Sequence, residues 1–302
     1  MLPYYLIPSR RNLIYWIKLI LVSSIIPFIM VYIDLLRGGG MHGRVQGAFT
    51  HPNILAFYSV FIVTVCIIIL KQSKKYNFSP KARTAVKILI INALIILVLT
   101  ETRSAWVALW GFLFLYGLIR NRRVLLLAIL LPVLALAIPK VQERVVDLTH
   151  GNVAGGYRKL NSFAWRLEMW KTALPEAMKR PIGGWGLASF QPYSAKYFTN
   201  KQVAGLGAHN AFLEQFFECG IIGLIAFISL FAYYIKHFYK LALLSTGKER
   251  DKYLILCVYV VSYLVICFSD NLTYYLVFNW YFWFFLGLMA REAQLEKVSE
   301  LK

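Results

Sequence analysis

The chain has 302 residues, of which 59% are hydrophobic and only 16% are charged. Several of its apolar runs are longer than a soluble core requires, because a helix that crosses a bilayer needs about 20 mostly apolar residues. The composition therefore excludes an ordinary soluble domain and predicts an all-α integral membrane protein.

The chain is also strongly basic, with 33 Lys and Arg residues against 14 Asp and Glu residues and a formal net charge of +19. In a soluble protein this excess would indicate a nucleic-acid partner. Here most bases flank apolar runs, as topology signals and contacts with anionic headgroups do. We therefore expect the lipid bilayer as a partner and no nucleic acid.

The apolar runs predict a polytopic helical bundle with about eight transmembrane helices. The expected spans are 13–34, 54–70, 86–100, 104–120, 123–139, 211–235, 253–270 and 272–290. They divide the chain into N-terminal transmembrane helices (1–139), a large loop (140–210), and C-terminal helices with a tail (211–302).

The loop charges predict the orientation, because Lys and Arg are enriched in cytoplasmic loops. Alternate loops are basic, which places both termini of this multi-pass protein in the cytoplasm. The loops that then face outward are 35–53, 101–103, 140–210 and 270–272.

The large outer loop, 140–210, is too long to be a simple connector and is a candidate functional segment. It contains the glycine-rich run Pro181-Ile-Gly-Gly-Trp-Gly186. Apolar residues recur at three- and four-residue steps around 160–179, which predicts an amphipathic helix that lies on the membrane surface. The residues of that stripe are Phe163, Leu167, Trp170 and Leu174.

Arg44, Arg103 and Arg166 are among the bases that fall on the outer side despite the charge rule. Arginine binds phosphate groups bidentately, so these side chains are candidates for a phosphate or diphosphate site. The alternative for Arg103 is an interfacial arginine that reaches the headgroups or pairs with Glu101. The alternative for Arg166 is a helix pairing or an aromatic stack.

A single histidine, His209, precedes the span at 211–235. Asn210, Glu214 and Glu218 follow at four-residue steps and therefore share one helix face. A carboxylate inside a membrane is costly, so we expect Glu218 to face the bundle interior and pair with a base. An imidazole takes up protons near neutral pH, which makes His209 a candidate general base, with a structural histidine as the alternative.

Common catalytic signatures are absent from the sequence. There is no Asp-x-Asp, Walker lysine loop, HExxH or serine nucleophile elbow. The chain has five histidines and no pattern of metal ligands. We therefore expect no metal and no cofactor, and any work on phosphate groups falls to the arginines.

In order and spacing, four fragments resemble the O-antigen ligase and O-antigen polymerase superfamily of bacterial membrane glycosyltransferases. The resemblance runs from about residue 44 to 290. Its fragments are Arg44-Val-Gln-Gly-Ala-Phe-Thr-His-Pro-Asn53, Thr100-Glu-Thr-Arg-Ser104, Trp165-Arg166…Trp170…Pro181-Ile-Gly-Gly-Trp-Gly186, and His209-Asn-Ala-Phe-Leu-Glu214…Glu218-Cys-Gly-Ile-Ile-Gly223.

The resemblance implies a donor glycan on a polyprenyl, usually undecaprenyl, diphosphate. It implies metal-independent transfer to a glycan or glycolipid acceptor, with inversion at the anomeric carbon, in cell-surface polysaccharide synthesis. Arg103 and Arg166, with Arg44, match the arginines that hold the donor diphosphate. His209 matches the histidine proposed as general base, with Asn210, Glu214 and Glu218 in support. Family members usually carry several more N-terminal spans, so the chain is expected to be short for the family.

Alternatives remain open. A ligase transfers a finished glycan to another acceptor, whereas a polymerase joins lipid-linked repeat units, and the sequence does not separate the two. A transporter of an anion or a lipid-linked glycan would spread polar residues through the membrane depth. A non-catalytic truncated scaffold would tolerate replacement of the arginines and the histidine.

Overall fold

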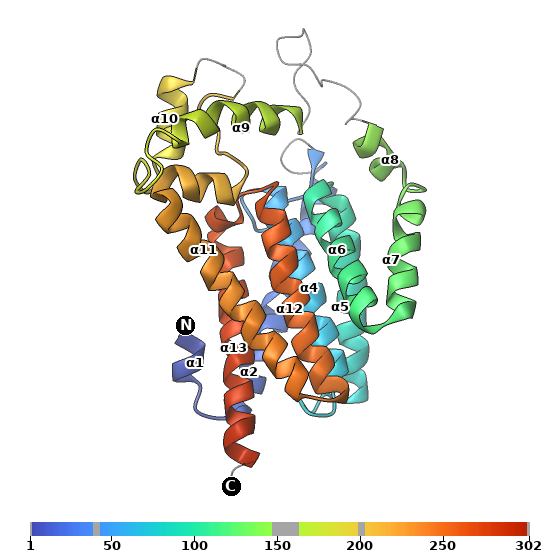
Figure 1. Cartoon of the computed structure of the whole chain (residues 1–302). Helices are drawn as coiled ribbons and strands as arrows, with labels where there is room; N and C mark the ends of the chain where they lie inside the picture. The colour runs from blue at the N-terminus through green and yellow to red at the C-terminus, as the bar shows by residue number, and fades with distance from the viewer. Residues whose placement is uncertain (1, 39–42, 147–162, 199–202, 301–302) are drawn as a thin grey trace. The chain divides into compact units, whose positions relative to one another are not determined.

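The structure, a computed structural model, describes residues 2–38, 43–146, 163–198 and 203–300 (Figure 1). These residues form helices and connecting turns, with no strand among them, which confirms the all-α class. They divide into two compact units. The first unit comprises 1–126, 235–259 and 275–302, and the second unit comprises 127–234 and 260–274. The three segments predicted from sequence concern membrane topology and remain a prediction.

The first unit contains most of the long apolar helices. Its elements are α1 (Leu2–Leu6), α2 (Arg10–Ser23), α3 (Ile25–Leu36), α4 (Pro52–Lys71), α5 (Pro80–Leu99), α6 (Arg103–Arg120) and α13 (Leu276–Glu300). Proline opens both α4 and α5, where its missing amide costs nothing. Ser79 caps α5 by accepting a hydrogen bond from the amide of Ala82.

Helix α4 forms the core of the first unit. It is apolar on every face, which predicts a buried helix. In its most apolar stretch, 83% of the residues are buried. It packs against α5, α6 and α13. Aromatic rings fill the contact with α13, where Phe61 lies 5.7 Å from Phe285 and Tyr58 lies 5.1 Å from Tyr281, centroid to centroid.

Each predicted span coincides with helical structure, which confirms a polytopic helical protein. Among the described residues, four segments are long and apolar enough to cross a membrane: Arg10–Leu36, α4, α5 and α11 (Ala211–Leu244). The first of these is not one helix, because it breaks at Ser24, between α2 and α3. The other predicted spans fall on α6, α7 (Arg122–Ala135), α12 (Gly247–Cys267) and α13. For these four helices, crossing the membrane remains a prediction.

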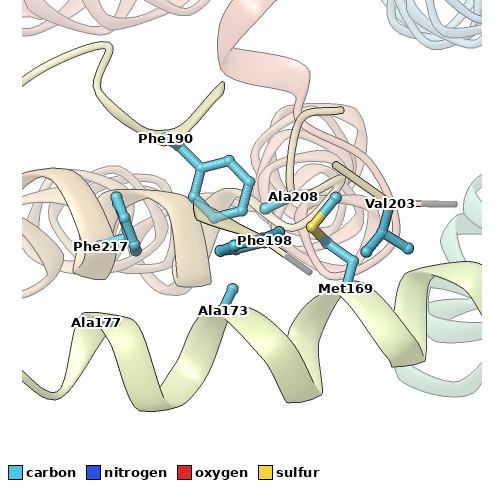
Figure 2. Close-up of a cluster of buried hydrophobic side chains, with 8 residues drawn as sticks. All are labelled: Met169, Ala173, Ala177, Phe190, Phe198, Val203, Ala208 and Phe217. Carbon is cyan, nitrogen blue, oxygen red and sulfur yellow. The ribbon is translucent and has the colours of Figure 1, made fainter. Parts of the chain in front are cut away.

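The second unit contains the described part of the large loop. Besides parts of α7, α11 and α12, its elements are α8 (Pro139–Val146), α9 (Ala164–Ala177), α10 (Phe190–Tyr197) and a short 3₁₀ helix, η3 (Leu272–Tyr274). Figure 2 shows its small apolar core, in which side chains of α9 face Phe190, Phe198 and Phe217. The loop therefore shares a hydrophobic core with the start of α11.

Helix α9 confirms the helix predicted around 160–179, but its buried face is not the predicted stripe. Its buried residues are Met169, Ala173 and Ala177 (Figure 2). Phe163 and Leu174 of the predicted stripe are 60% and 51% exposed. Two alanines dominate the buried face, so it is weakly hydrophobic in sequence. The exposed apolar stripe is available to the membrane surface, as predicted, and that placement remains a prediction.

The glycine-rich run of the loop is bonded to a bend in α11. Gly220 leaves the helical conformation, with φ 63° and ψ −164°, so the normal hydrogen bonds around it are lost. The segment 181–186 replaces them. The amides of Trp185 and Gly186 donate to the carbonyls of Phe217 and Glu218, both at 2.9 Å. The amide of Ile221 donates to the carbonyl of Pro181 at 2.8 Å.

This close approach requires glycine on both sides. A Cβ on Gly184 would lie 2.4 Å from the carbonyl oxygen of Glu218, and a Cβ on Gly220 would lie 2.0 Å from that of Ile182. Both residues also have positive φ, at 70° and 63°. L-residues with side chains rarely adopt that region. The neighbouring Gly183 has neither constraint, since nothing lies within 4 Å of its added Cβ.

We predict that Gly184→Ala lowers the free energy of unfolding by roughly 2–4 kcal/mol, through backbone strain and overpacking. Gly183→Ala is the matched control and is expected to change it by less than about 0.5 kcal/mol. The measurement is thermal unfolding of the purified protein in detergent. Equal transition temperatures for the two variants would contradict this account of the bend.

Candidate active site

The candidate histidine lies just before α11. Asn210 caps this helix, because its side-chain oxygen accepts hydrogen bonds from the amides of Phe212 and Leu213, both at 3.1 Å. His209 itself has a φ of 45°, a left-handed conformation that is uncommon for residues with a side chain. Strained residues of this kind persist where the surrounding structure holds them, and they cluster at functional sites.

His209 lies beside a buried carboxylate. Its Nδ1 atom is 3.3 Å from Oδ1 of Asp270, close but outside hydrogen-bonding geometry, and the side chains are 33% and 1% exposed, respectively. Asp270 is in turn held by the amide of Asn271, which donates to Oδ1 at 2.9 Å. A carboxylate at Nδ1 favours the tautomer with a proton there and leaves Nε2 as the acceptor.

Helix α9 supplies the other wall of this site. The ring of Trp165 meets the His209 ring edge to face, with centroids 4.9 Å apart. The guanidinium of Arg166 lies 5.1 Å from the centroid of the same tryptophan. Further along the helix, the indole of Trp170 donates to the carbonyl of Ala208 at 2.8 Å. The structure thus brings both Arg166 and His209 against the ring of Trp165, and the aromatic stack considered for Arg166 is present.

The two glutamates that follow His209 are buried, and they share a tyrosine. Glu214 accepts hydrogen bonds from the hydroxyl of Tyr274 at 2.5 Å, from the amide of Ala208 at 3.3 Å and from the side chain of Asn271. Glu218 accepts from the same Tyr274 hydroxyl at 3.4 Å. These contacts bind the start of α11 to the segment that carries Asp270.

The expectation that Glu218 pairs with a base is wrong for the described residues. Besides Tyr274, its partner is the amide of Phe190, which donates to Oε1 at 3.2 Å. Phe190 is the first residue of α10, so the carboxylate caps that helix, where unpaired amides and the helix dipole favour negative charge. The prediction failed because one backbone amide and one hydroxyl donate to this carboxylate, in place of a positively charged side chain.

A second polar link joins α9 to α10. Glu176 accepts hydrogen bonds from Lys179 at 2.7 Å and from the hydroxyl of Tyr193 at 2.6 Å, and these lower the pKa of its carboxyl. Burial, together with the bond to Glu176, raises the pKa of Tyr193 to about 12. The indole of Trp185 donates to the carbonyl of Glu176 at 2.9 Å, which ties the glycine-rich run to the same point.

Arg44 and Arg103 belong to the first unit. Arg44 donates to the carbonyl of Thr100 at 2.7 Å, to the hydroxyl of Thr102 at 2.7 Å and to the side chain of Asn53 at 3.2 Å. Arg103 follows as the first residue of α6 and is half-buried. Arg44 therefore secures the turn that presents Arg103, which is a positioning role that the sequence did not suggest.

Sequence reasoning missed the segment that carries Asp270, Asn271 and Tyr274. It treated 270–272 as a brief outer turn and assigned it no role. The available signal was the polar run Ser269-Asp-Asn271 between two strongly apolar stretches. A search of the described residues finds no group of three or more His, Cys, Asp or Glu side chains that could hold a metal ion.

These features define a polytopic all-helical membrane protein with a histidine–aspartate pair and an arginine at one site. Residues 88–228 match the family described as O-Antigen ligase. This match confirms the resemblance that the motifs indicate, and it includes Arg103, Arg166 and His209.

The chain is also 28% identical over 203 residues to an uncharacterized protein of Haemophilus influenzae. The aligned part covers 62% of this chain and 49% of that relative, so the chain spans about half the relative's length.

We predict that Tyr274→Phe lowers the free energy of unfolding by about 1–3 kcal/mol, because two buried carboxylates lose their shared donor. Tyr197→Phe is the control, since that ring is 55% exposed on α10 of the same unit. Chemical unfolding of both variants, followed by tryptophan fluorescence, provides the measurement. The account would be wrong if the two substitutions cost the same.

Proposed function

We propose that the protein is a membrane glycosyltransferase of the O-antigen ligase and polymerase type. It transfers a glycan from a polyprenyl diphosphate, of which undecaprenyl diphosphate is the usual form, to the hydroxyl of an acceptor sugar. The reaction takes place at the outer face of the cytoplasmic membrane and serves cell-surface polysaccharide synthesis. The match over 88–228 supports the family, and the site supports the chemistry.

The observation that carries the proposal is the pair of His209 and Asp270. An acceptor hydroxyl is a weak nucleophile until a base removes its proton. Oδ1 of Asp270 lies 3.3 Å from Nδ1, which leaves Nε2 of His209 to accept that proton. The acceptor oxygen then bonds to the anomeric carbon. A positioned base of this kind contributes roughly 10²–10⁴-fold to the rate.

The leaving group is the second half of the mechanism. As the new bond forms, the bond from the anomeric carbon to the diphosphate oxygen breaks, and negative charge develops on the diphosphate. Preorganised arginines that face such a charge supply the largest catalytic term in many enzymes. We assign this role to Arg166 and Arg103, with Arg44 securing the turn that carries Arg103.

Two finer points follow from the same proposal. Attack on the face opposite the diphosphate inverts the anomeric carbon, and no metal is needed because arginines take the charge. Glu214, Glu218 and Asn210 support the site by holding α11, α10 and the segment 270–274 together. Whether the acceptor is a second lipid-linked repeat or a different glycolipid separates a polymerase from a ligase.

The test is a transfer assay on the full chain in nanodiscs, with an undecaprenyl-diphosphate glycan, candidate acceptors and a chelator. We predict that His209→Ala slows transfer roughly 10²–10⁴-fold. Asp270→Asn and Arg166→Gln are expected to slow it by at least about 10-fold, because one loses the orienting carboxylate and the other a donor-binding charge. Lys171→Gln is the control for Arg166→Gln, since it removes one charge from an exposed position of the same helix.

The product of the assay tests the stereochemistry and distinguishes the two kinds of acceptor. Its anomeric configuration, read by NMR, tests inversion, and the acceptor used distinguishes polymerase from ligase. Equal rates for His209→Ala and the wild type would contradict the proposed base. If the wild type transfers nothing but moves the donor across vesicles, the protein is a transporter. With neither activity, a scaffold is favoured.

A further inference from the structure

A long apolar groove runs along α5 in the first unit. It has a volume of about 900 Å³ and lies between α5 and the α2–α3 pair. Its walls include Leu21, Val22 and Ile25 on one side and Ile88 and Ile95 on the other. Helix rise is 1.5 Å per residue, so the lining of α5 from 79 to 95 extends over roughly 24 Å. The groove therefore has the length and character of a site for a hydrocarbon chain.

The two ends of the groove differ. At one end, the hydroxyl of Tyr32 on α3 donates to the side chain of Asn92 on α5 and links the two helices. At the other end, Lys18 and Asn77 line both this groove and a second cavity of about 660 Å³. The groove thus leads from an exposed apolar part, which includes Ile88 and Ile95, into a polar mouth.

The second cavity is basic. Its charged lining residues are Arg10, Arg11, Lys18 and Lys75, with no Asp or Glu among the residues that line it. Lys75 is already neutralised by Glu249 at 2.7 Å and Glu292 at 2.9 Å. Arg11 and Lys18 are exposed, and in the part of the chain that the structure describes no carboxylate pairs with them. The mouth therefore offers positive charge to an anion.

We propose that this groove and its basic mouth bind one anionic phospholipid. An acyl chain lies along α5, and the headgroup phosphate is held by Arg11, Lys18 and Arg10. Basic pockets between transmembrane helices on the cytoplasmic side bind anionic headgroups, and the loop charges place this end of α2 on that side. The site is independent of His209 and of the donor site.

The test is native mass spectrometry of the full chain in detergent, titrated with phosphatidylglycerol and, separately, with phosphatidylcholine. We expect saturable binding of phosphatidylglycerol and at least tenfold weaker binding of phosphatidylcholine. Each basic residue near a headgroup contributes about 1 kcal/mol. The double variant Arg11→Gln/Lys18→Gln is therefore expected to weaken phosphatidylglycerol binding roughly thirty-fold.

Two matched controls isolate the site. Lys236→Gln/Lys240→Gln removes two exposed charges that line neither cavity, and it should leave binding within about twofold. Ala85→Trp fills the groove without a charge change and should weaken binding, whereas Leu94→Trp, on α5 outside the groove, should not.

Several results would overturn the proposal. An equal loss of phosphatidylglycerol affinity in the two double variants would mean that the basic residues attract the lipid only through the overall charge of the protein. Equal binding of phosphatidylglycerol and phosphatidylcholine would mean that the basic mouth does not recognise the headgroup charge. A third contrary result has two parts: millimolar inorganic phosphate displaces the lipid, and Ala85→Trp binds the lipid as well as the wild type does. The mouth would then be a pocket for anions, and the groove would not bind an acyl chain.

Discussion

A backbone exchange between the segment 181–186 and α11 holds the second unit together. Gly220 opens the helix, and the run Pro181–Gly186 supplies the missing donors and acceptor. Buried backbone groups must be paired, so a bend here is stable only while the loop is docked. The exchange also fixes the geometry of Glu218, whose carbonyl bonds Gly186 while its carboxylate caps α10.

The geometry of the candidate active site depends on this docking of segment 181–186 against α11. Helix α9 packs through Met169 and Ala173 onto the core of the second unit (Figure 2). This packing sets Trp165 against His209. Asp270 reaches the same histidine from the far end of α12, held there by Asn271 and Tyr274 on the buried glutamates. Costly buried carboxylates are thus retained because each bonds several donors. The result is a histidine surrounded by groups that belong to distant parts of the chain.

Much of the fold follows from the sequence, because helix length, apolar periodicity and proline at helix starts are local signals. The shared face of Glu214 and Glu218 was also predictable from spacing. Asp270 was not, since its partner His209 is joined to it only by tertiary packing. The buried face of α9 was missed because Ala173 and Ala177 carry little hydrophobic signal. The partner of Glu218 was misjudged because a backbone amide leaves no trace in the sequence.

Hydrogen–deuterium exchange of the purified chain tests most directly whether loop and helix form one cooperative unit. The account predicts that peptides covering 181–186 and 217–221 exchange slowly and at a common rate, because amides of each segment donate to carbonyls of the other. Gly184→Ala should accelerate both, together with the peptide that contains His209. Rapid exchange of 181–186 beside a protected 217–221, unchanged by that substitution, would contradict it.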